Sequence, residues 1–263
     1  MKNKKIWVIK AGSQMVIDGG PLLIRDWMRQ VKCLKADYNI EVIWVTSGAI
    51  ATARRQSGIK GQRLSEKQAL SAMGQPLVHS LYHLGLEALG LRAAQVLLTA
   101  DDLGNKKRRL NLVSTLTTLI EWNVTPILNE NDTVSTEEIQ FGDNDRLSAL
   151  VSIALKAERL ILLTDVDGLY DRDPKTATTK HPAHLIETLP GIDKKTLALA
   201  GKGTSTVGKG GMRSKLLAAR ETHKHGIDTH LIRGDRPHSL VSIADPKRFG
   251  KSIGTHVSRK RRR

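Results

Sequence analysis

The chain has 263 residues and a formal net charge of +16, and 40% of its residues are hydrophobic but only 3% aromatic. No apolar run approaches the roughly 20 residues of a membrane-spanning helix, and a single cysteine excludes an intrachain disulfide and a multi-cysteine metal site. The scarcity of aromatic residues argues against a base-stacking nucleic-acid platform, so we expect the basic runs at 105–109 and 258–263 to be solvated. From the length, the lack of a long apolar run and the single cysteine, we expect one soluble, cytoplasmic domain over residues 1–263.

Short apolar runs alternate with longer segments of helical periodicity along the chain. The runs are nearly continuous in apolar residues, which predicts strands of a mostly parallel sheet that is covered on both faces. The chain is therefore predicted to have an α/β fold of layered βαβ units. The expected strands are 5–10, 40–47, 92–99, 124–128, 159–165 and 228–232. The expected helices include 21–37, 65–90, 108–123 and one that ends at Gly226.

The first two expected strands each end in a polar loop that contains glycine. Lys10 leaves the first strand just before Gly12, and a lysine is a poor choice for a buried strand unless its charge meets a partner. A lysine that extends from the strand end to solvent explains the same residue. Ser47 and Gly48 follow the second strand where a helix is to begin, so ligand binding and helix capping both remain open for Ser47.

Short amides and carboxylates gather twice between residues 129 and 145. Residues 129–132 read "NEND" and residues 142–145 read "GDND", and each group lies at the edge of an apolar segment. Asp143 or Asn144 could serve as the N-cap of the following helix. Capping explains one of these residues and leaves the others unexplained. Together the two groups fit an amino-acid-like ligand, with carboxylates for an ammonium group and amides for carboxylate oxygens.

Glycines precede the last expected long helix. Gly208, Gly210 and Gly211 lead into it, and the backbone N–H groups of such a junction favour anions. Lys215 lies near the start of the helix, and helical side chains lean toward the N-terminus, so its ammonium group could reach the same anion. A flexible loop with a surface lysine is the alternative. Together with the lysine of the first strand, Lys215 suits a triphosphate.

Six segments match one known family in the same order, and the match extends from Lys10 to the "IGTHV" at residues 253–257. The chain resembles the glutamate 5-kinase family of the amino acid kinase superfamily. The motif "KQALSAMGQ" and the pair "NEND" and "GDND" are the specific part, whereas "KAG" and "DGLYDRDP" indicate only the superfamily. The matching segments are "VIKAGS", "VTSGAI" with "KQALSAMGQ", "NENDTV", "GDNDRLSAL", "LLTDVDGLYDRDP" and "GKGGMRSK".

The resemblance implies a three-layer αβα sandwich with the amino-acid site in its N-terminal part and the nucleotide site in its C-terminal part. It implies transfer of the ATP γ-phosphoryl group to the γ-carboxylate of L-glutamate, which gives L-glutamyl 5-phosphate in the first step of proline biosynthesis. Mg²⁺ would be carried by ATP, with no metal ligand from the protein. A carboxylate with a pKa of about 4.3 is already ionised at neutral pH, so the reaction requires no general base.

The resemblance also implies residue roles by motif position. Lys10 would steady the transferring phosphoryl group, Lys215 the leaving oxygen, and Asp145 would hold both lysines in place. The implied glutamate contacts are Ser47, Asn129, Asp132 and Asn144. The implied nucleotide contacts are Lys10, Gly12, Thr164, Asp165, Lys209, Gly210, Gly211, Met212 and Lys215.

Three positions depart from the family pattern. A small hydroxyl residue is usual at Lys209, a second hydroxyl residue is usual at Gln14, and Val113 lies where "LNAR" is usual. These departures concern turnover and nucleotide affinity more than the fold. Many relatives carry a C-terminal PUA domain, and we expect none in this chain. Relatives form dimers and tetramers, so we expect a homo-oligomer; a hand-off of the labile product to a glutamyl phosphate reductase is left open.

Two alternative functions remain. One is another amino acid kinase, acting on acetylglutamate, UMP or carbamate, against which the "NEND" and "GDND" groups argue. The other is a non-catalytic basic relative that binds nucleic acid or regulates a partner, with strongly salt-dependent binding and no ATP turnover. The presence of Lys10, Asp145 and Lys215 argues against this second alternative.

Overall fold

The computed structural model describes residues 4–134, 144–174, 176–200, 211–251 and 254–259. The described residues form one sheet with the strand order β3-β4-β2-β1-β5-β7-β8-β6, and only the β7–β8 pair is antiparallel. The strands are β1 (Lys5–Ala11), β2 (Ile40–Val45), β3 (Arg92–Leu98), β4 (Val124–Glu130), β5 (Arg159–Thr164), β6 (Thr188–Leu189), β7 (Asp228–Arg233) and β8 (Gly254–Val257).

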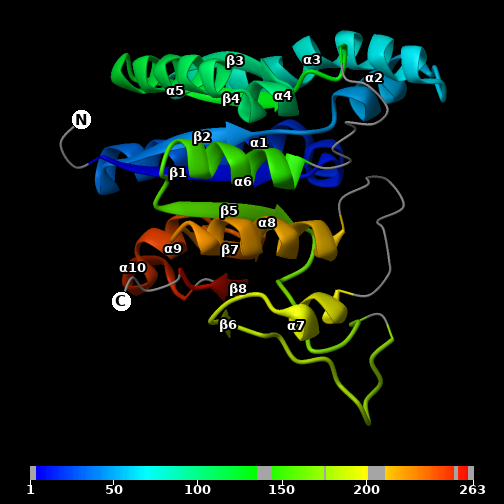
Figure 1. Cartoon of the computed structure of the whole chain (residues 1–263), viewed down its shortest axis with the longest axis vertical. Coiled ribbons are helices and arrows are strands. Elements are labelled where there is room, and N and C mark those ends of the chain that lie inside the picture. The colour runs from blue at the N-terminus through cyan, green and yellow to red at the C-terminus, as the bar shows by residue number, and fades with distance from the viewer. Residues whose placement is uncertain (1–3, 135–143, 175, 201–210, 252–253, 260–263) are drawn as a thin grey trace.

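Helices cover both faces of this sheet, so the predicted α/β sandwich is confirmed. Figure 1 shows the sheet running through the molecule, with β3 and β4 at one end and the C-terminal strands at the other. The long helices are α1 (Ser13–Tyr38), α2 (Ala49–Ser57), α3 (Leu64–Glu87), α5 (Lys106–Glu121), α6 (Asn144–Ala154) and α8 (Met212–Lys224). The short helices are α4 (Ala100–Gly104), α7 (Lys194–Leu199), α9 (Val241–Ala244) and α10 (Pro246–Phe249).

The alternation of side chains along β1 divides the core into two layers. Trp7 and Ile9 pack with α1 and α3, in the layer that also contains Trp27 and Trp44. Ile6 and Val8 face the opposite way and pack with α5, α6 and α8. Because successive strand residues point to opposite faces, Lys10 shares the face of Ile6 and Val8. The sheet thus directs this lysine toward α6 and α8.

All six strands expected from the sequence are present, but the first helix begins earlier than expected. It starts at Ser13 rather than at residue 21. A first helical piece precedes Gly20, which adopts φ 54° and ψ −155° and joins this piece to the expected helix across a kink. Pro21 follows the kink, where its missing N–H costs least. The strands β6 and β8 were not predicted. Both are too short to give the long apolar run that identifies a buried strand.

Candidate active site

The polar loops predicted from the sequence meet at one edge of the sheet. Strands β4, β2, β1 and β5 are consecutive neighbours and parallel, so their carboxyl ends lie side by side. The segments that leave or end these strands are those with "NEND", "TSGAI", "KAGS" and "TDVDGLY". In open α/β sheets this edge is where ligands bind.

A buried carboxylate between two buried lysines forms the centre of this edge. Asp145 is fully buried in the first turn of α6. One of its oxygens lies 2.8 Å from Lys10 Nζ, and the other lies 3.1 Å from Lys215 Nζ. Ser214, beside Lys215 on α8, donates a hydrogen bond of 2.8 Å to Asp145. Asp145 therefore contacts both lysines, and the role expected for it stays a prediction.

Both lysines are held in place by the fold. Lys10 is 1% exposed at the end of β1, and Lys215 is 6% exposed in the first turn of α8. Helix α6 packs against β1 and against α8, which brings three segments far apart in the sequence to one point. A lysine buried without a partner would lose its charge or destabilise the fold, so the carboxylate permits two ammonium groups to remain charged there. Lys10 does not extend to solvent, and Lys215 is not a surface lysine.

A cluster of amide and hydroxyl groups adjoins Asp145. Asn144 Nδ2 lies 2.6 Å from Asn129 Oδ1, 3.0 Å from Ser47 Oγ and 2.5 Å from the Thr46 carbonyl oxygen. These bonds join α6 to the ends of β2 and β4. The side chain of Asn144 therefore holds three elements together, which helix capping alone would not achieve.

Ser47 is not the helix cap that the sequence left open. The N-cap of α2 is Gly48, with φ 97° and no side-chain capping bond. Ser47 Oγ instead accepts a hydrogen bond from Asn144 Nδ2, so Ser47 belongs to the cluster. Asn129 lies within β4 itself, one residue before the strand ends, and is buried.

Asp132 is tied to this cluster through two residues that the sequence analysis did not select. Ser71 Oγ donates a bond of 2.9 Å to Asp132, and Gln75 Nε2 lies 3.4 Å from the same Ser71 hydroxyl. Asn129 Nδ2 then donates to Gln75 Oε1 at 2.9 Å. Both residues are buried on α3, in the motif "KQALSAMGQ", and their spacing of four residues placed them on one helical face. This spacing was the feature of the sequence from which the pair could have been predicted.

The carboxyl group of Asp132 has no cationic partner within the described residues. Burial raises the pKa of this carboxyl group above its ordinary value, and the hydrogen bond from Ser71 opposes that shift. A half-buried carboxylate with one hydroxyl donor gains from a ligand cation. The arrangement suits an ammonium group.

The expected nucleotide contacts lie at the ends of β1 and β5 and at the start of α8. Gly12 and Gly211 are the N-caps of α1 and α8, and neither helix has a side-chain capping bond. Thr164 ends β5 and donates to Asp165 at 3.2 Å, while Met212 packs against the core around Leu169. Lys209 and Gly210 lie outside the described residues, as does Asp143.

Within the described ranges, no group of three or more His, Cys, Asp or Glu side chains could hold a metal ion. In the same part of the chain, no helix combines the length and apolar character that crossing a bilayer demands.

Comparison with known proteins gives matches over almost the whole chain. A family model described as "Amino acid kinase family" matches residues 5–233. The glutamate 5-kinase of Meiothermus ruber is 44% identical over 228 residues, which are 86% of this chain and 58% of that protein. Those of Chromobacterium violaceum and Thermus thermophilus are each 41% identical, over 95% and 97% of this chain and 67% and 68% of their own lengths. The chain thus spans between 58% and 68% of these relatives.

Two solved structures share the fold. The N-acetylglutamate synthase of Neisseria gonorrhoeae superposes with a TM-score of 0.70 at 15% identity, over 99% of this chain and 61% of that one. The UMP kinase of Ureaplasma parvum gives a TM-score of 0.62 at 15% identity, over 98% and 100% of the two chains. At such low identity these structures support the architecture alone.

Proposed function

We infer the reaction of this site from a premise that the matches establish: the chain belongs to the amino acid kinase family and, within it, to the glutamate 5-kinases. We propose that it transfers the γ-phosphoryl group of ATP to the γ-carboxylate of L-glutamate. The product is L-glutamyl 5-phosphate, and the reaction is the first step of proline biosynthesis. Because the chain spans about two thirds of most of these relatives, the proposal concerns the activity of this kinase domain.

The observation that carries the proposal is the Lys10–Asp145–Lys215 arrangement. Phosphoryl transfer to a carboxylate forms one O–P bond and breaks the bond to the ADP oxygen, so negative charge accumulates on the transferring group and on the leaving oxygen. Two fixed ammonium groups in a buried site stabilise that charge, since preorganised charges cost no rearrangement during the reaction. In this proposal Lys10 acts on the transferring group and Lys215 on the leaving oxygen.

Asp145 is a positioning residue in this scheme. It keeps the two ammonium groups charged and separated, and Ser214 donates to one of its oxygens. The incoming carboxylate is already ionised at neutral pH, and the scheme therefore needs no side chain that removes a proton. Mg²⁺ bound to the ATP phosphates would supply further charge neutralisation, and the protein's contribution is the lysine pair.

The amide and hydroxyl cluster supports glutamate as the acceptor. Asp132 offers a carboxylate that lacks a cation among its described neighbours, and the α-ammonium group of an amino acid would fill that place. A chain of hydrogen bonds runs from Asp132 through Ser71, Gln75 and Asn129 to Asn144, which precedes Asp145. An acceptor held along this chain has its ammonium group at one end and its reacting carboxylate near the lysines.

ADP release from Mg-ATP with L-glutamate, with hydroxylamine present to trap an acyl phosphate, tests the proposal. D-glutamate, N-acetylglutamate and UMP serve as alternative acceptors. We expect ADP and hydroxamate only with L-glutamate. If the folded protein releases no ADP with any acceptor, the kinase proposal is excluded. Turnover of UMP or N-acetylglutamate alone would reassign the substrate.

Three further expectations accompany the proposal and stay predictions: a homo-oligomeric state, a hand-off of the labile product to a reductase, and a cytoplasmic location. Sedimentation of the purified chain would decide the first of these.

A further inference from the structure

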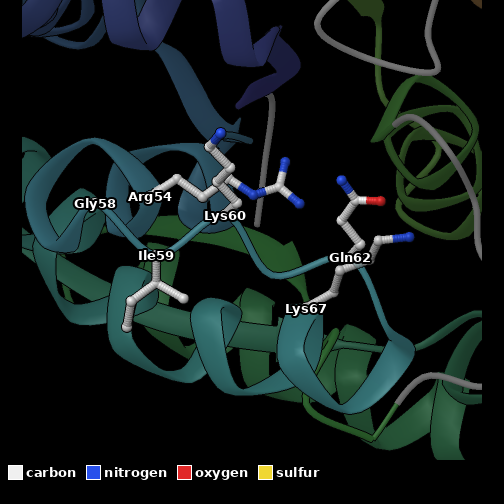
Figure 2. A pocket seen from close by; sticks show the side chains of 6 residues that line it. All are labelled: Arg54, Gly58, Ile59, Lys60, Gln62 and Lys67. Carbon is white, nitrogen blue, oxygen red and sulfur yellow. The ribbon is translucent and has the colours of Figure 1, made fainter.

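A basic hollow lies outside the site described above, at the connection between α2 and α3. It is an open hollow of about 520 Å³, lined by Arg54, Gly58, Ile59, Lys60, Gln62 and Lys67. Figure 2 shows the side chains of Arg54, Lys60, Gln62 and Lys67 extending to one side of the connection, while Ile59 points the other way. Three cationic groups and one amide therefore surround the same space.

Among the residues that the structure describes, no acidic side chain lines this hollow. The nearest carboxylate along the connection, Glu66, accepts bonds from the side chain of Arg63 at 2.6 and 2.8 Å and from two backbone N–H groups. Lys60 and Lys67 have no carboxylate partner within the described part of the chain, and neither does Arg54. Like charges around one cavity repel each other, so the cluster gains from an anion that enters it.

The connection is rigid enough to present a preformed site. Arg54 donates a hydrogen bond of 2.6 Å to the Gly61 carbonyl oxygen, and the Gly58 N–H donates one of 2.9 Å to the Arg54 carbonyl oxygen. Gly58 and Gly61 adopt positive φ angles of 74° and 46°, and a Cβ at Gly61 would lie 2.5 Å from Leu70 Cδ1. The backbone is thus fixed against α3 before any ligand binds, which lowers the entropic cost of binding.

Helix α3 contributes residues both to the hollow and to the amino-acid site. Lys67 lies one turn before Ser71 and two turns before Gln75, so the three residues share a helical face. Helix α2 meets α3 at Gly74, where a Cβ would lie 1.9 Å from the Ala49 carbonyl oxygen. The two helices therefore contact each other without an intervening side chain, and they carry both the hollow and the Ser71–Gln75 pair.

We propose that this hollow is a second binding site, for a compact anion that carries at least two negative charges. Two or three cationic groups converging from one preformed connection match a phosphate or a polycarboxylate better than a monoanion. The site is separate from the nucleotide and glutamate positions, and binding there does not depend on the proposed kinase reaction.

Calorimetric titration of the full chain with citrate, and separately with inorganic phosphate, tests this inference. A non-hydrolysable ATP analogue with Mg²⁺ is kept at saturation so that the probes do not enter the triphosphate position, and ionic strength is held constant. The test variant is Lys60→Gln with Lys67→Gln, and Arg54 is retained because it bonds the Gly61 carbonyl group. The matched control is Lys106→Gln with Lys107→Gln on the exposed start of α5.

We expect one equivalent of at least one probe to bind, and the test variant to weaken that binding roughly tenfold or more, because the variant removes two of the three cationic groups that line the hollow. The control variant should bind as the wild type does. Equal weakening in both variants would show that the net charge attracts the anion without a specific site, and this would overturn the inference. Failure of both probes to bind would overturn it as well. A kinase assay on the same samples is independent, so failure of one proposal is distinguishable from failure of the other.

Discussion

Two polar clusters, the first buried and the second only partly buried, lie at opposite edges of the sheet, and they differ in how their charges are arranged. At the carboxyl ends, two lysines share Asp145. At the amino ends, His256 bonds Asp228 at 3.0 Å and stacks on His230 with ring centroids 4.4 Å apart. A cluster of polar groups packed into the sheet therefore does not by itself identify a catalytic site.

The amino-end cluster is a closed set of complementary partners. Arg159 donates 2.8 Å to His230 Nε2 and lies over the ring of Trp7, which itself donates to Glu158. Carboxylates close the set at both ends, Glu158 at one and Asp228 at the other. The carboxyl-end cluster instead gathers two cations around one anion, in the position proposed for the transferring phosphoryl group. Variants at the two ends should therefore affect different properties.

Asp145→Asn should give the largest effect, because it leaves two buried ammonium groups without their carboxylate. Breaking such a buried pair costs about 3–5 kcal/mol, so both the free energy of unfolding and the turnover should fall steeply. Urea unfolding and the hydroxamate assay measure the two quantities. Asp101→Asn, at an exposed position of α4, is the control. A variant with wild-type stability would contradict the positioning role.

Lys215→Ala should separate activity from stability. The change removes one cation but leaves Asp145 paired with Lys10, so the fold persists while kcat falls roughly 100- to 1000-fold, as for loss of one group that stabilises transition-state charge. Lys10→Ala should behave alike. The exposed Lys107→Ala on α5 controls for loss of charge. Near-normal kcat in either lysine variant would remove that lysine from the proposed chemistry.

Asp132→Ala tests the amino-acid end of the site. Loss of the carboxylate should raise the apparent KM for glutamate roughly ten- to hundredfold, the range of a hydrogen bond to a charged group, and leave the KM for ATP unchanged. Thr133→Ala, exposed at the next position, is the matched control. An effect confined to the KM for ATP would contradict the placement of the ammonium group.

Asp228→Asn should give the smallest change and should spare kcat. Burial alone would raise the pKa of Asp228, but bonds from His256 and the Arg259 N–H outweigh burial and hold the pKa at about 2. Because the folded pKa lies below the unfolded value, the stabilisation is complete above about pH 4 and is lost as the pH falls toward about 2. It amounts to at most about 2 kcal/mol.

Urea unfolding of wild type and Asp228→Asn between pH 7 and pH 2 measures this difference. The two proteins should converge as the pH falls from about 4, and a constant difference would show that the carboxylate charge is not the cause. Burial also keeps the pKa of His230 well below its ordinary 6.5, so the unfolded chain binds a proton first and both proteins should lose stability as the pH falls through 6.5.

Much of the fold could be predicted because most of the longer strands are buried on both faces. Continuous apolar runs identified the six longer strands, and the parallel arrangement then placed Lys10, Ser47 and Asn129 at one edge. Strand β8 was not predicted, because its pairing with β7 is antiparallel and its four residues form no continuous apolar run. The kink at Gly20 depends on one backbone angle that a helical pattern does not reveal.

The site was predicted less completely than the sheet. The lysines and Asp145 have chemistry that stands out in apolar surroundings, and their meeting follows from topology. Ser71 and Gln75 are ordinary residues on a long helix, and only the packing of α3 against β4 gives them partners. Long-range hydrogen bonds between neutral side chains leave little trace in a single sequence.

The pleat of β1 links the chemistry of this protein to its folding. Lys10 is opposite Val45 of β2 and Leu162 of β5, and it shares a face with Val8. A shift of one residue in the pairing would turn this lysine into the tryptophan layer on the other side. Such a misaligned chain would carry a buried charge with no counterion, so its sheet is selected against during assembly. The residue proposed for phosphoryl transfer thus also favours the native strand register over a register shifted by one residue.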